Sequence, residues 1–193
     1  MKKFGILGGS FNPPHIAHSI VADSVREQLE LDKIIFIPSG NHPLKNSLSG
    51  GHRYEMSRLA FGRNENFEVS DIEVRNPEEK SYTVDTLQKL TKLYENDNVK
   101  LFLIIGIDNL IELHKWKEPG KLFRLSKVIV INRPDYDISN SHKEFSKKAE
   151  YITVPYLEIS STIIRKRVYE GRSIKYVTAE KVEEYIYKNN LYR

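Results

Sequence analysis

The sequence predicts an α/β protein with a doubly wound parallel sheet. The first observation is a set of short β-rich runs that are apolar without interruption, which is typical of strands buried on both faces of a parallel sheet. The second is that segments with helical periodicity lie between these runs, and strands that alternate with helices imply right-handed crossovers. The runs are FGIL (4–7), KIIFIP (33–38), KLFLIIG (100–106) and KVIVIN (127–132).

Three segments between these runs carry apolar residues at helical spacing. In the segment 83–94, Val84, Leu87, Leu90 and Leu93 fall on one face, which predicts that this face packs against the sheet. The other two expected helices cover residues 16–31 and 52–61.

The C-terminal part has a different pattern. After YITVPY (151–156) come two helical patterns, 160–171 and 178–190. We expect Gly171 to end the first helix and Thr178 to cap the second, because glycine favours helix ends and threonine favours N-caps.

The chain is expected to form one domain. Its 193 residues suffice for a single well-buried core, and no internal repeat, low-complexity tract or linker is evident. The stretch 133–150 is the most polar and least periodic, which predicts a surface loop with one short helix. The predicted domain therefore spans residues 1–193, with a small C-terminal helical portion at about 157–193.

Composition narrows the class of protein. The net charge of +4, from 30 basic and 26 acidic residues, suits anionic small molecules as well as nucleic acid. The absence of cysteine excludes disulfides, thiolate nucleophiles and cysteine-based zinc sites. No stretch approaches the roughly 20 apolar residues of a membrane span, and the first apolar run is shorter than the core of a signal peptide. A soluble, cytoplasmic protein is therefore expected.

The segment GGSFNPPHIAH (8–18) follows the first predicted strand. Ligands of open α/β sheets bind beyond the carboxyl ends of the strands, and Gly8 and Gly9 would let a ligand approach the main chain closely. A helix that begins near His15 would point free N–H groups at the same place, and His15 and His18 would share one side of its first turn. The segment therefore predicts an anion site.

Two other interpretations of the histidines stay open. They could be zinc ligands, although H-x-x-H lacks the glutamate and the spacing of H-E-x-x-H. They could also be two half-exposed polar residues at a helix start. The common phosphate motifs do not apply, because the chain has no G-x-x-x-x-G-K-[ST] and no third glycine of G-x-G-x-x-G here.

Two motifs resemble the nucleotidyltransferase superfamily. GGSFNPPHIAH resembles its H-x-G-H signature, with Ala17 where the motif usually carries glycine. ISSTIIR (159–165) resembles the second phosphate motif of that superfamily, in the expected order along the chain. The resemblance implies a Rossmann-like nucleotidyltransferase fold.

A third segment narrows the resemblance. SYTVDT (81–86) is similar to the nicotinate-recognition segment of bacterial nicotinate-mononucleotide adenylyltransferases. GIDNL (106–110), Trp116 and Arg133-Pro134 extend the similarity almost from end to end. That family joins ATP and nicotinate mononucleotide, with release of pyrophosphate and formation of deamido-NAD in NAD biosynthesis.

The resemblance implies a set of site residues. His15 and His18 would be catalytic. ATP would be bound by Gly8, Gly9, Ser10, Phe11, His15, His18, Gly106, Asp108, Ile159, Ser160, Ser161 and Arg165. The nicotinate nucleotide would be bound by Lys45, Ser81, Tyr82, Thr83, Trp116 and Arg133. Around Lys45 the usual Pro-Pro-His-Lys of the family reads His-Pro-Leu-Lys. Mg²⁺ would bind through the substrate phosphates, without a metal site of the protein's own.

Several of these residues have a structural alternative. Ser81 and Thr83 could cap a helix rather than bind a carboxylate, and Trp116 could be a core aromatic rather than a stacking platform. Asp108 could cap a helix or accept a hydrogen bond from a ribose hydroxyl, and Arg165 could be a solvated cation rather than a phosphate ligand.

The implied mechanism is in-line attack on the α-phosphate of ATP, in which His15 and His18, with Ser161 and Arg165, stabilise charge and no general base is needed. Alternatives are a related adenylyltransferase that accepts nicotinamide mononucleotide or phosphopantetheine, and a non-catalytic nucleotide sensor. Binding of nucleic acid is not expected, because no K-M-S-K-S and no basic stretch with interleaved aromatics occur. The sequence leaves a homo-oligomer open.

Overall fold

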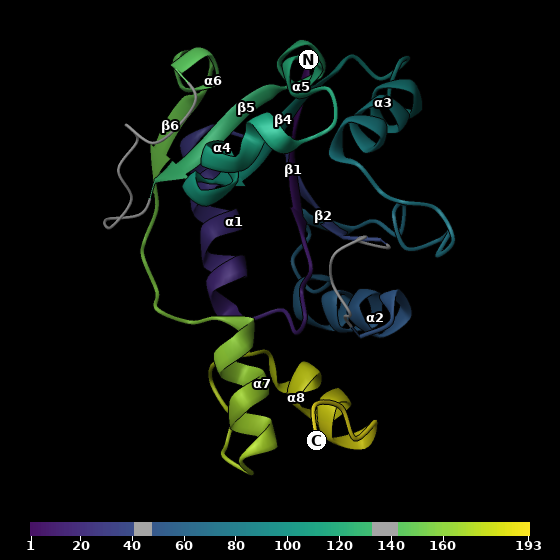
Figure 1. The fold of residues 1–193 in the computed structure, drawn as a ribbon, viewed down its shortest axis with the longest axis vertical. Coiled ribbons are helices and arrows are strands. Elements are labelled where there is room, and N and C mark those ends of the chain that lie inside the picture. The colour runs from purple at the N-terminus through teal and green to yellow at the C-terminus, as the bar shows by residue number, and fades with distance from the viewer. Residues whose placement is uncertain (41–47, 133–142) are drawn as a thin grey trace.

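A parallel sheet of six strands forms the centre of the protein (Figure 1). The structure, a computed structural model, describes residues 1–40, 48–132 and 143–193. The strand order is β3-β2-β1-β4-β5-β6, and every neighbouring pair is parallel. The strands are β1 (Lys2–Gly9), β2 (Lys33–Pro38), β3 (Phe67–Val69), β4 (Val99–Gly106), β5 (Lys127–Asn132) and β6 (Glu150–Thr153). The order reverses between β1 and β4, as in a doubly wound fold, so the predicted fold class is confirmed.

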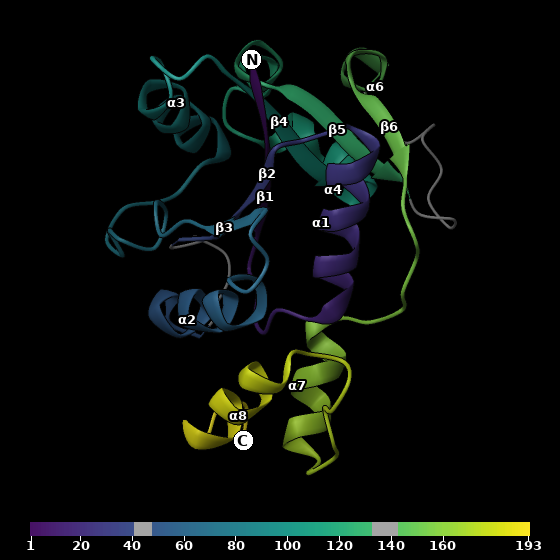
Figure 2. The same cartoon turned by 180° about the vertical axis from the view of Figure 1, so that it is seen from behind.

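Helices cover both faces of the sheet. In Figure 1 α4 and α5 lie in front of the sheet, and the reverse view in Figure 2 brings α1 to the front. The helices within this layered part are α1 (Ile16–Gln28), α2 (Gly50–Phe61), α3 (Thr83–Leu93), α4 (Ile107–Glu112), α5 (Pro119–Leu125) and α6 (Lys143–Lys148), with a short 3₁₀ helix, η1 (Leu113–Lys115). No helix in residues 1–40, 48–132 and 143–193 is long and apolar enough to cross a membrane.

The uninterrupted apolar runs follow from this arrangement. Alternate residues of β1 point to opposite faces, so Phe4 and Ile6 join the cluster under α3, α4 and α5, while Leu7 joins the cluster under α1 and α2. Val84, Leu87 and Leu90 of α3 are buried in the first cluster as predicted, whereas Leu93 is exposed at the end of the helix.

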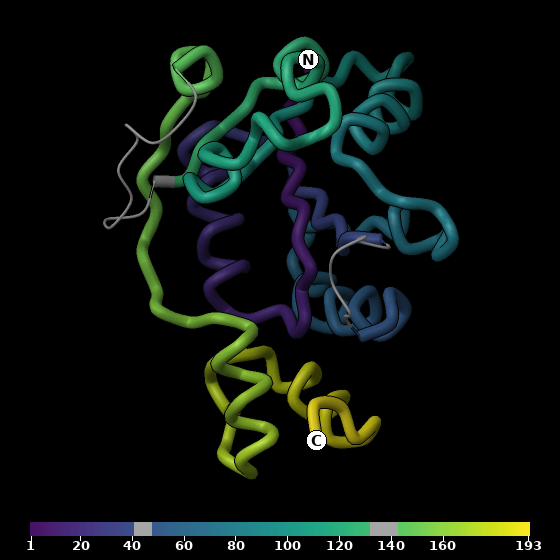
Figure 3. The backbone as a smooth tube through the Cα atoms, in the orientation of Figure 1, coloured from purple at the N-terminus to yellow at the C-terminus, as the bar shows by residue number. Residues whose placement is uncertain are grey.

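The C-terminal helices form a separate small unit. An extended segment leads from β6 along the molecule to α7 (Ser161–Tyr169), and α8 (Glu180–Lys188) returns beside it (Figure 3). Both pack with α2 through a third apolar cluster that includes Met56, Ile164 and Ile186. The unit lies next to the carboxyl end of β1, on the side of the molecule opposite the N-terminus (Figure 1).

The predicted helix ends agree with the structure at Gly171 and differ from it at two other positions. Gly171 follows α7 with a φ of 67°, which confirms its predicted role. The predicted cap at Thr178 is wrong, because Ala179 is the N-cap of α8 and the Thr178 hydroxyl donates to another segment. The first helix ends at Gln28 rather than residue 31, since Glu30 has a positive φ. The short helix expected in 133–150 is α6.

Candidate active site

The predicted phosphate turn lies at the carboxyl end of β1, beside the point where the strand order reverses. Gly8 is exposed, and a Cβ atom there would meet nothing within 4 Å, so the main chain is open to a ligand. Ser10 is also exposed. Phe11 has a φ of 44° and is buried, with only 2% of its surface exposed. Only the main chain of Phe11 is therefore open to a ligand, and its ring packs beneath Gly9, where a Cβ atom would lie 3.0 Å from it.

The two histidines are in direct contact at the start of α1. His15 is the N-cap of α1, and the two rings are stacked with their centroids 3.7 Å apart. The His15 amide donates to Nδ1 of His18 at 3.1 Å. Because Nδ1 of His18 accepts this bond, a neutral His18 ring carries its proton on Nε2. The main chain thus fixes the tautomer that presents an N–H donor.

His15 is nearly buried, at 8% exposure, and burial lowers its pKa to about 4. Its ring is therefore neutral near pH 7, and its buried Nδ1 has no hydrogen-bond partner within the described part of the chain. No group of three or more His, Cys, Asp or Glu side chains suited to a metal occurs in those residues, so the zinc interpretation finds no third ligand there.

The ISSTIIR motif lies against the turn that leads to these histidines. Ser160 is the N-cap of α7 and accepts a bond from the Ile163 amide at 3.2 Å, while Ile159 is half-buried beside the third apolar cluster. Ser161 donates from Oγ to the carbonyl of Pro13 at 2.7 Å, and Arg165 donates from Nη1 to the carbonyl of Asn12 at 2.8 Å. Two motifs almost 150 residues apart therefore meet. The alternative of Arg165 as a merely solvated cation is wrong.

Asp108 lies across the switch point, in the first turn of α4. Its carboxylate does not cap the helix, so the capping alternative is wrong; the N-cap is Gly106. One oxygen, Oδ1, is buried without a hydrogen-bond partner in residues 1–40, 48–132 and 143–193. A side chain at Gly106 would collide with that oxygen, so the glycine makes room for the carboxylate. A buried acceptor without a donor is suited to a ligand hydroxyl.

The SYT segment begins α3 as predicted. Tyr82 is the N-cap, and no side chain caps the helix, so the capping alternative for Ser81 and Thr83 is wrong. A pocket of about 260 Å³ is lined by Ser81 and Tyr82, together with residues of α3. Lys117 lies 4.8 Å from the centre of the Tyr82 ring and pairs with Asp85.

Trp116 follows η1 on the same side of the sheet as α3, and is partly buried at the edge of the first cluster. The Trp116 ring is therefore neither fully buried in the core nor fully exposed for a ligand ring to stack on. Lys45 and Arg133 lie outside the described residues.

Sequence reasoning missed Arg53, which joins the ends of β1 and β2. This α2 residue is only 2% exposed, and it donates to the carbonyls of Ser10 at 3.0 Å, Ser39 at 2.6 Å and Leu48 at 2.9 Å. Desolvation lowers its pKa. The available signal was its helical spacing from Met56, which puts a charged residue on an apolar face.

Sequence reasoning also missed Glu73, which joins the end of β2 to α3. Its carboxylate accepts from the Gly40 amide at 3.2 Å and from the Thr86 hydroxyl at 2.7 Å. A Cβ atom at Gly40 would collide with the carbonyl of Glu73, so the two segments are in close main-chain contact.

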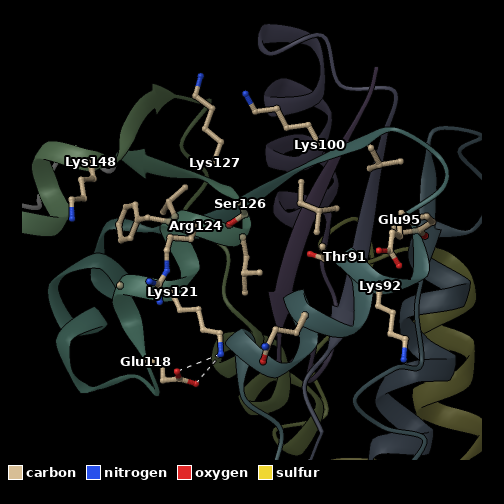
Figure 4. Close-up of a pocket in the computed structure, with 18 of the residues that line it drawn as sticks. Thr91, Lys92, Glu95, Lys100, Glu118, Lys121, Arg124, Ser126, Lys127 and Lys148 are labelled. Carbon is tan, nitrogen blue, oxygen red and sulfur yellow. Dashed lines mark hydrogen bonds and ion pairs between the residues drawn. The ribbon is translucent and has the colours of Figure 1, made fainter.

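A larger open hollow lies elsewhere. It is formed by α3, α5 and the amino ends of β4 and β5, and it is rich in cations such as Lys92, Lys100, Arg124 and Lys127 (Figure 4). None of the predicted site residues that the structure describes lines it. It also lies at the opposite edge of the sheet from the histidines, so we do not assign the active site to it.

Comparison with known proteins agrees with this geometry. The cytidylyltransferase-like family matches residues 6–167. The "probable nicotinate-nucleotide adenylyltransferase" of Lachnoclostridium phytofermentans is 38% identical over 100% of both chains. The chain belongs to the nicotinate-nucleotide adenylyltransferase family. A second such adenylyltransferase, from Desulfitobacterium hafniense, is 41% identical over 100% of this chain and 96% of its own.

Solved structures of similar adenylyltransferases share the fold. A nicotinic acid mononucleotide adenylyltransferase of Plasmodium falciparum, in complex with NaAD, is 26% identical, with a TM-score of 0.81 over 100% of this chain and 98% of that one. The same protein in complex with APC gives a TM-score of 0.79 at 25% identity, again over 100% and 98% of the two chains. The present adenylyltransferase is therefore a nucleotidyltransferase of NAD biosynthesis.

Proposed function

We propose that this adenylyltransferase joins the AMP part of ATP to nicotinate mononucleotide, giving deamido-NAD and pyrophosphate, and that His15 and His18 are its catalytic residues. The arrangement that carries the proposal is the stacked pair of histidines at the start of α1, next to the turn that Ser161 and Arg165 contact. These groups converge at the N-terminal end of α1, where the helix dipole favours an anion.

The chemistry needs positioning and charge stabilisation more than covalent participation. An oxygen of the acceptor phosphate forms a bond to the α-phosphorus of ATP. The bond from that phosphorus to the bridging oxygen breaks, and its electron pair leaves with pyrophosphate. The attacking oxygen is already anionic, so no general base is required.

Each histidine has a distinct role in this proposal. His18 donates from Nε2 to the α-phosphate as charge develops, because Nδ1 is occupied by the His15 amide. His15 lies beneath it and holds the phosphate chain together with Ser10. Ala17, which replaces the glycine of the H-x-G-H motif, is buried at 8% exposure and does not separate the two rings.

Ser161 and Arg165 act on the departing pyrophosphate. Arg165 uses Nη1 for the Asn12 carbonyl, and Nη2 lies 3.2 Å from the Thr162 hydroxyl on the exposed side of the residue. The guanidinium has further N–H donors, so it can hold the turn and contact phosphate at once. Because the Ser161 hydroxyl is donated to Pro13, its main-chain amide at the start of α7 is the group offered to phosphate.

Mg²⁺ is proposed to enter with the phosphates. The described residues contain no cluster of carboxylates or histidines for a protein-held ion, which fits binding through phosphate oxygens and water. The ion would neutralise phosphate charge. The protein's own contribution would be the donors at the starts of α1 and α7.

The second nucleotide is proposed to bind at the start of α3. The helix lacks a side-chain cap, so its amides can receive the carboxylate of nicotinate, and Trp116 on the same side can meet the flat ring. Asp108 is proposed to accept a hydrogen bond from a ribose hydroxyl through its buried Oδ1. Lys45 and Arg133 remain expectations from the family resemblance.

The test is release of pyrophosphate from ATP with nicotinate mononucleotide, nicotinamide mononucleotide or phosphopantetheine, assayed side by side. We expect kcat/KM to be at least about tenfold higher with nicotinate mononucleotide, since a charged hydrogen bond contributes about 1.5–3 kcal/mol. Purified His18→Ala protein controls for contaminating activity. ATP binding without pyrophosphate release would identify a sensor, and a preference for another acceptor would refute the proposed substrate.

A further inference from the structure

The turn Asn12–Pro13–Pro14 connects the glycines of β1 to the histidines of α1. Its two prolines have no N–H groups, so the turn cannot stabilise itself through their amides. It depends on donors from other segments for its carbonyl groups. In the structure those donors come from the C-terminal helical unit.

Every carbonyl of the turn accepts a side-chain hydrogen bond from that unit. Arg165 donates to the Asn12 carbonyl at 2.8 Å and Ser161 to the Pro13 carbonyl at 2.7 Å. The hydroxyl of Thr178 donates to the Pro14 carbonyl at 2.8 Å, and that of Tyr192 donates to Oδ1 of Asn12 at 2.6 Å. In the reverse direction, the Ile16 amide donates to the carbonyl of Val177 at 3.1 Å.

Two of these donors have no place in the proposed phosphate site. Thr178 is 4% exposed, and Tyr192 is half-buried with its ring against Met56 and its neighbours. Burial raises the pKa of Tyr192 well above its usual range, so its hydroxyl remains a donor at all pH values of interest. Ser161 and Arg165, by contrast, would also contact phosphate in the proposed site. A substitution at either residue would therefore change both the turn and phosphate binding.

The position of the turn sets the position of both catalytic rings. His15 directly follows Pro14, and its amide holds Nδ1 of His18. A shift of the Pro14 carbonyl therefore moves the His15 amide and, through it, the His18 ring. Misplacement of a catalytic group by about 1 Å can lower the rate on the order of 10²-fold.

We propose that Thr178 and Tyr192 are positioning residues, which fix the turn and thereby aim His15 and His18 at the phosphates. The inference rests on the proposed catalytic roles of the two histidines. The effect of the two hydroxyls on the turn can be separated from folding of the C-terminal unit, because that unit is packed by apolar residues such as Ile164, Val182 and Ile186. Thr178 is not a member of that apolar cluster, whereas the Tyr192 hydroxyl also lies 3.9 Å from Sδ of Met56, which is.

The experiment compares Thr178→Val and Tyr192→Phe with the wild type. Each change removes one hydroxyl and keeps the size of the side chain. We expect kcat to fall about tenfold or more in each variant, with KM for ATP changed by less than about twofold. The reason is that the substitutions change the orientation of the histidine rings and not the binding of ATP. Thr178→Ser, which restores the hydroxyl, should recover most of the loss.

Tyr185→Phe is the matched control. Tyr185 belongs to the same unit, but its hydroxyl contacts His52 at 2.9 Å and not the turn. This variant should keep the kcat of the wild type. Histidine-ring NMR signals of His15 and His18 should shift in Thr178→Val and Tyr192→Phe and stay in place in Tyr185→Phe.

Folded Thr178→Val and Tyr192→Phe proteins with kcat within about twofold of wild type and unshifted histidine signals would overturn the inference. So would a loss of activity that Thr178→Ser does not restore. If Thr178→Val does not fold, Tyr192→Phe decides the outcome. If the wild type itself releases no pyrophosphate, the proposed function fails, and the NMR signals alone then report on positioning.

Discussion

Replacing Arg53 with methionine removes the side chain that joins the ends of β1 and β2. The resulting decrease in the free energy of unfolding can be calculated from its contacts. Three of its bonds, to the carbonyls of Leu48, Ser10 and Ser39, are 2.9, 3.0 and 2.6 Å long. Hydrogen bonds to charged groups contribute about 1.5–3 kcal/mol each, which sets a gross upper limit of about 9 kcal/mol. The contributions are not additive, and removing one partner of a buried charged network costs about 3–5 kcal/mol, so we expect the free energy of unfolding to fall by that amount.

For a domain of this size, 1 kcal/mol corresponds to about 2–4 °C in Tm, so Arg53→Met should lower Tm by about 10 °C in a thermal melt. The control is Arg58→Met on the same helix, whose side chain is 58% exposed and pairs only with Glu55 among the described contacts. That exposed pair contributes about 0–1 kcal/mol, so Tm should change by no more than about 2–4 °C. Equal melting of Arg53→Met and wild type would refute the reasoning.

Three further predictions concern the site. His18→Ala should lower kcat on the order of 10²–10³-fold, or about 3 kcal/mol, with Tm nearly unchanged; a folded variant with full activity contradicts its role. Asp108→Ala should raise KM for ATP about tenfold or more without lowering Tm, because its carboxylate makes no cap; a collapse of Tm would restore the capping interpretation. His15 should make folding sensitive to acid. Its pKa of about 4 lies below the usual histidine value of 6.5, so the unfolded state binds the proton first and stability falls as pH decreases. Between pH 8 and pH 5 this loss is about 2 kcal/mol, and urea melts of His15→Gln should lack it.

Most of the sheet could be predicted because its central strands are buried on both faces and therefore read as uninterrupted apolar runs. The predicted runs at 33–38 and 127–132 match β2 and β5 residue for residue. The edge strand β3 has only three residues, all half-buried, and such a short segment has no periodicity to detect. The short helix α5 was missed for the same reason.

Part of the candidate site could likewise be predicted from the sequence, and part could not. The family resemblance implied that ISSTIIR and the histidine turn act on the same phosphate chain, and in the structure the two segments are in contact. Thr178 was expected to cap a helix, since local sequence favours that role, and only the folded chain brings its hydroxyl to Pro14. Arg53 was missed because its partners are main-chain carbonyls, which have no sequence signature.

The central position of β1 has a consequence for hydrogen exchange. β1 is paired with β2 over Phe4–Gly9 and with β4 over Lys2–Leu7, so it has a neighbouring strand on each side over its middle four residues and its amides should exchange slowly. The edge strands β3 and β6 have one neighbour each and should exchange first. Gly8 and Gly9, at the base of the predicted phosphate turn, belong to this interior strand. Fluctuations that open the margins of the molecule therefore leave the base of the phosphate site intact.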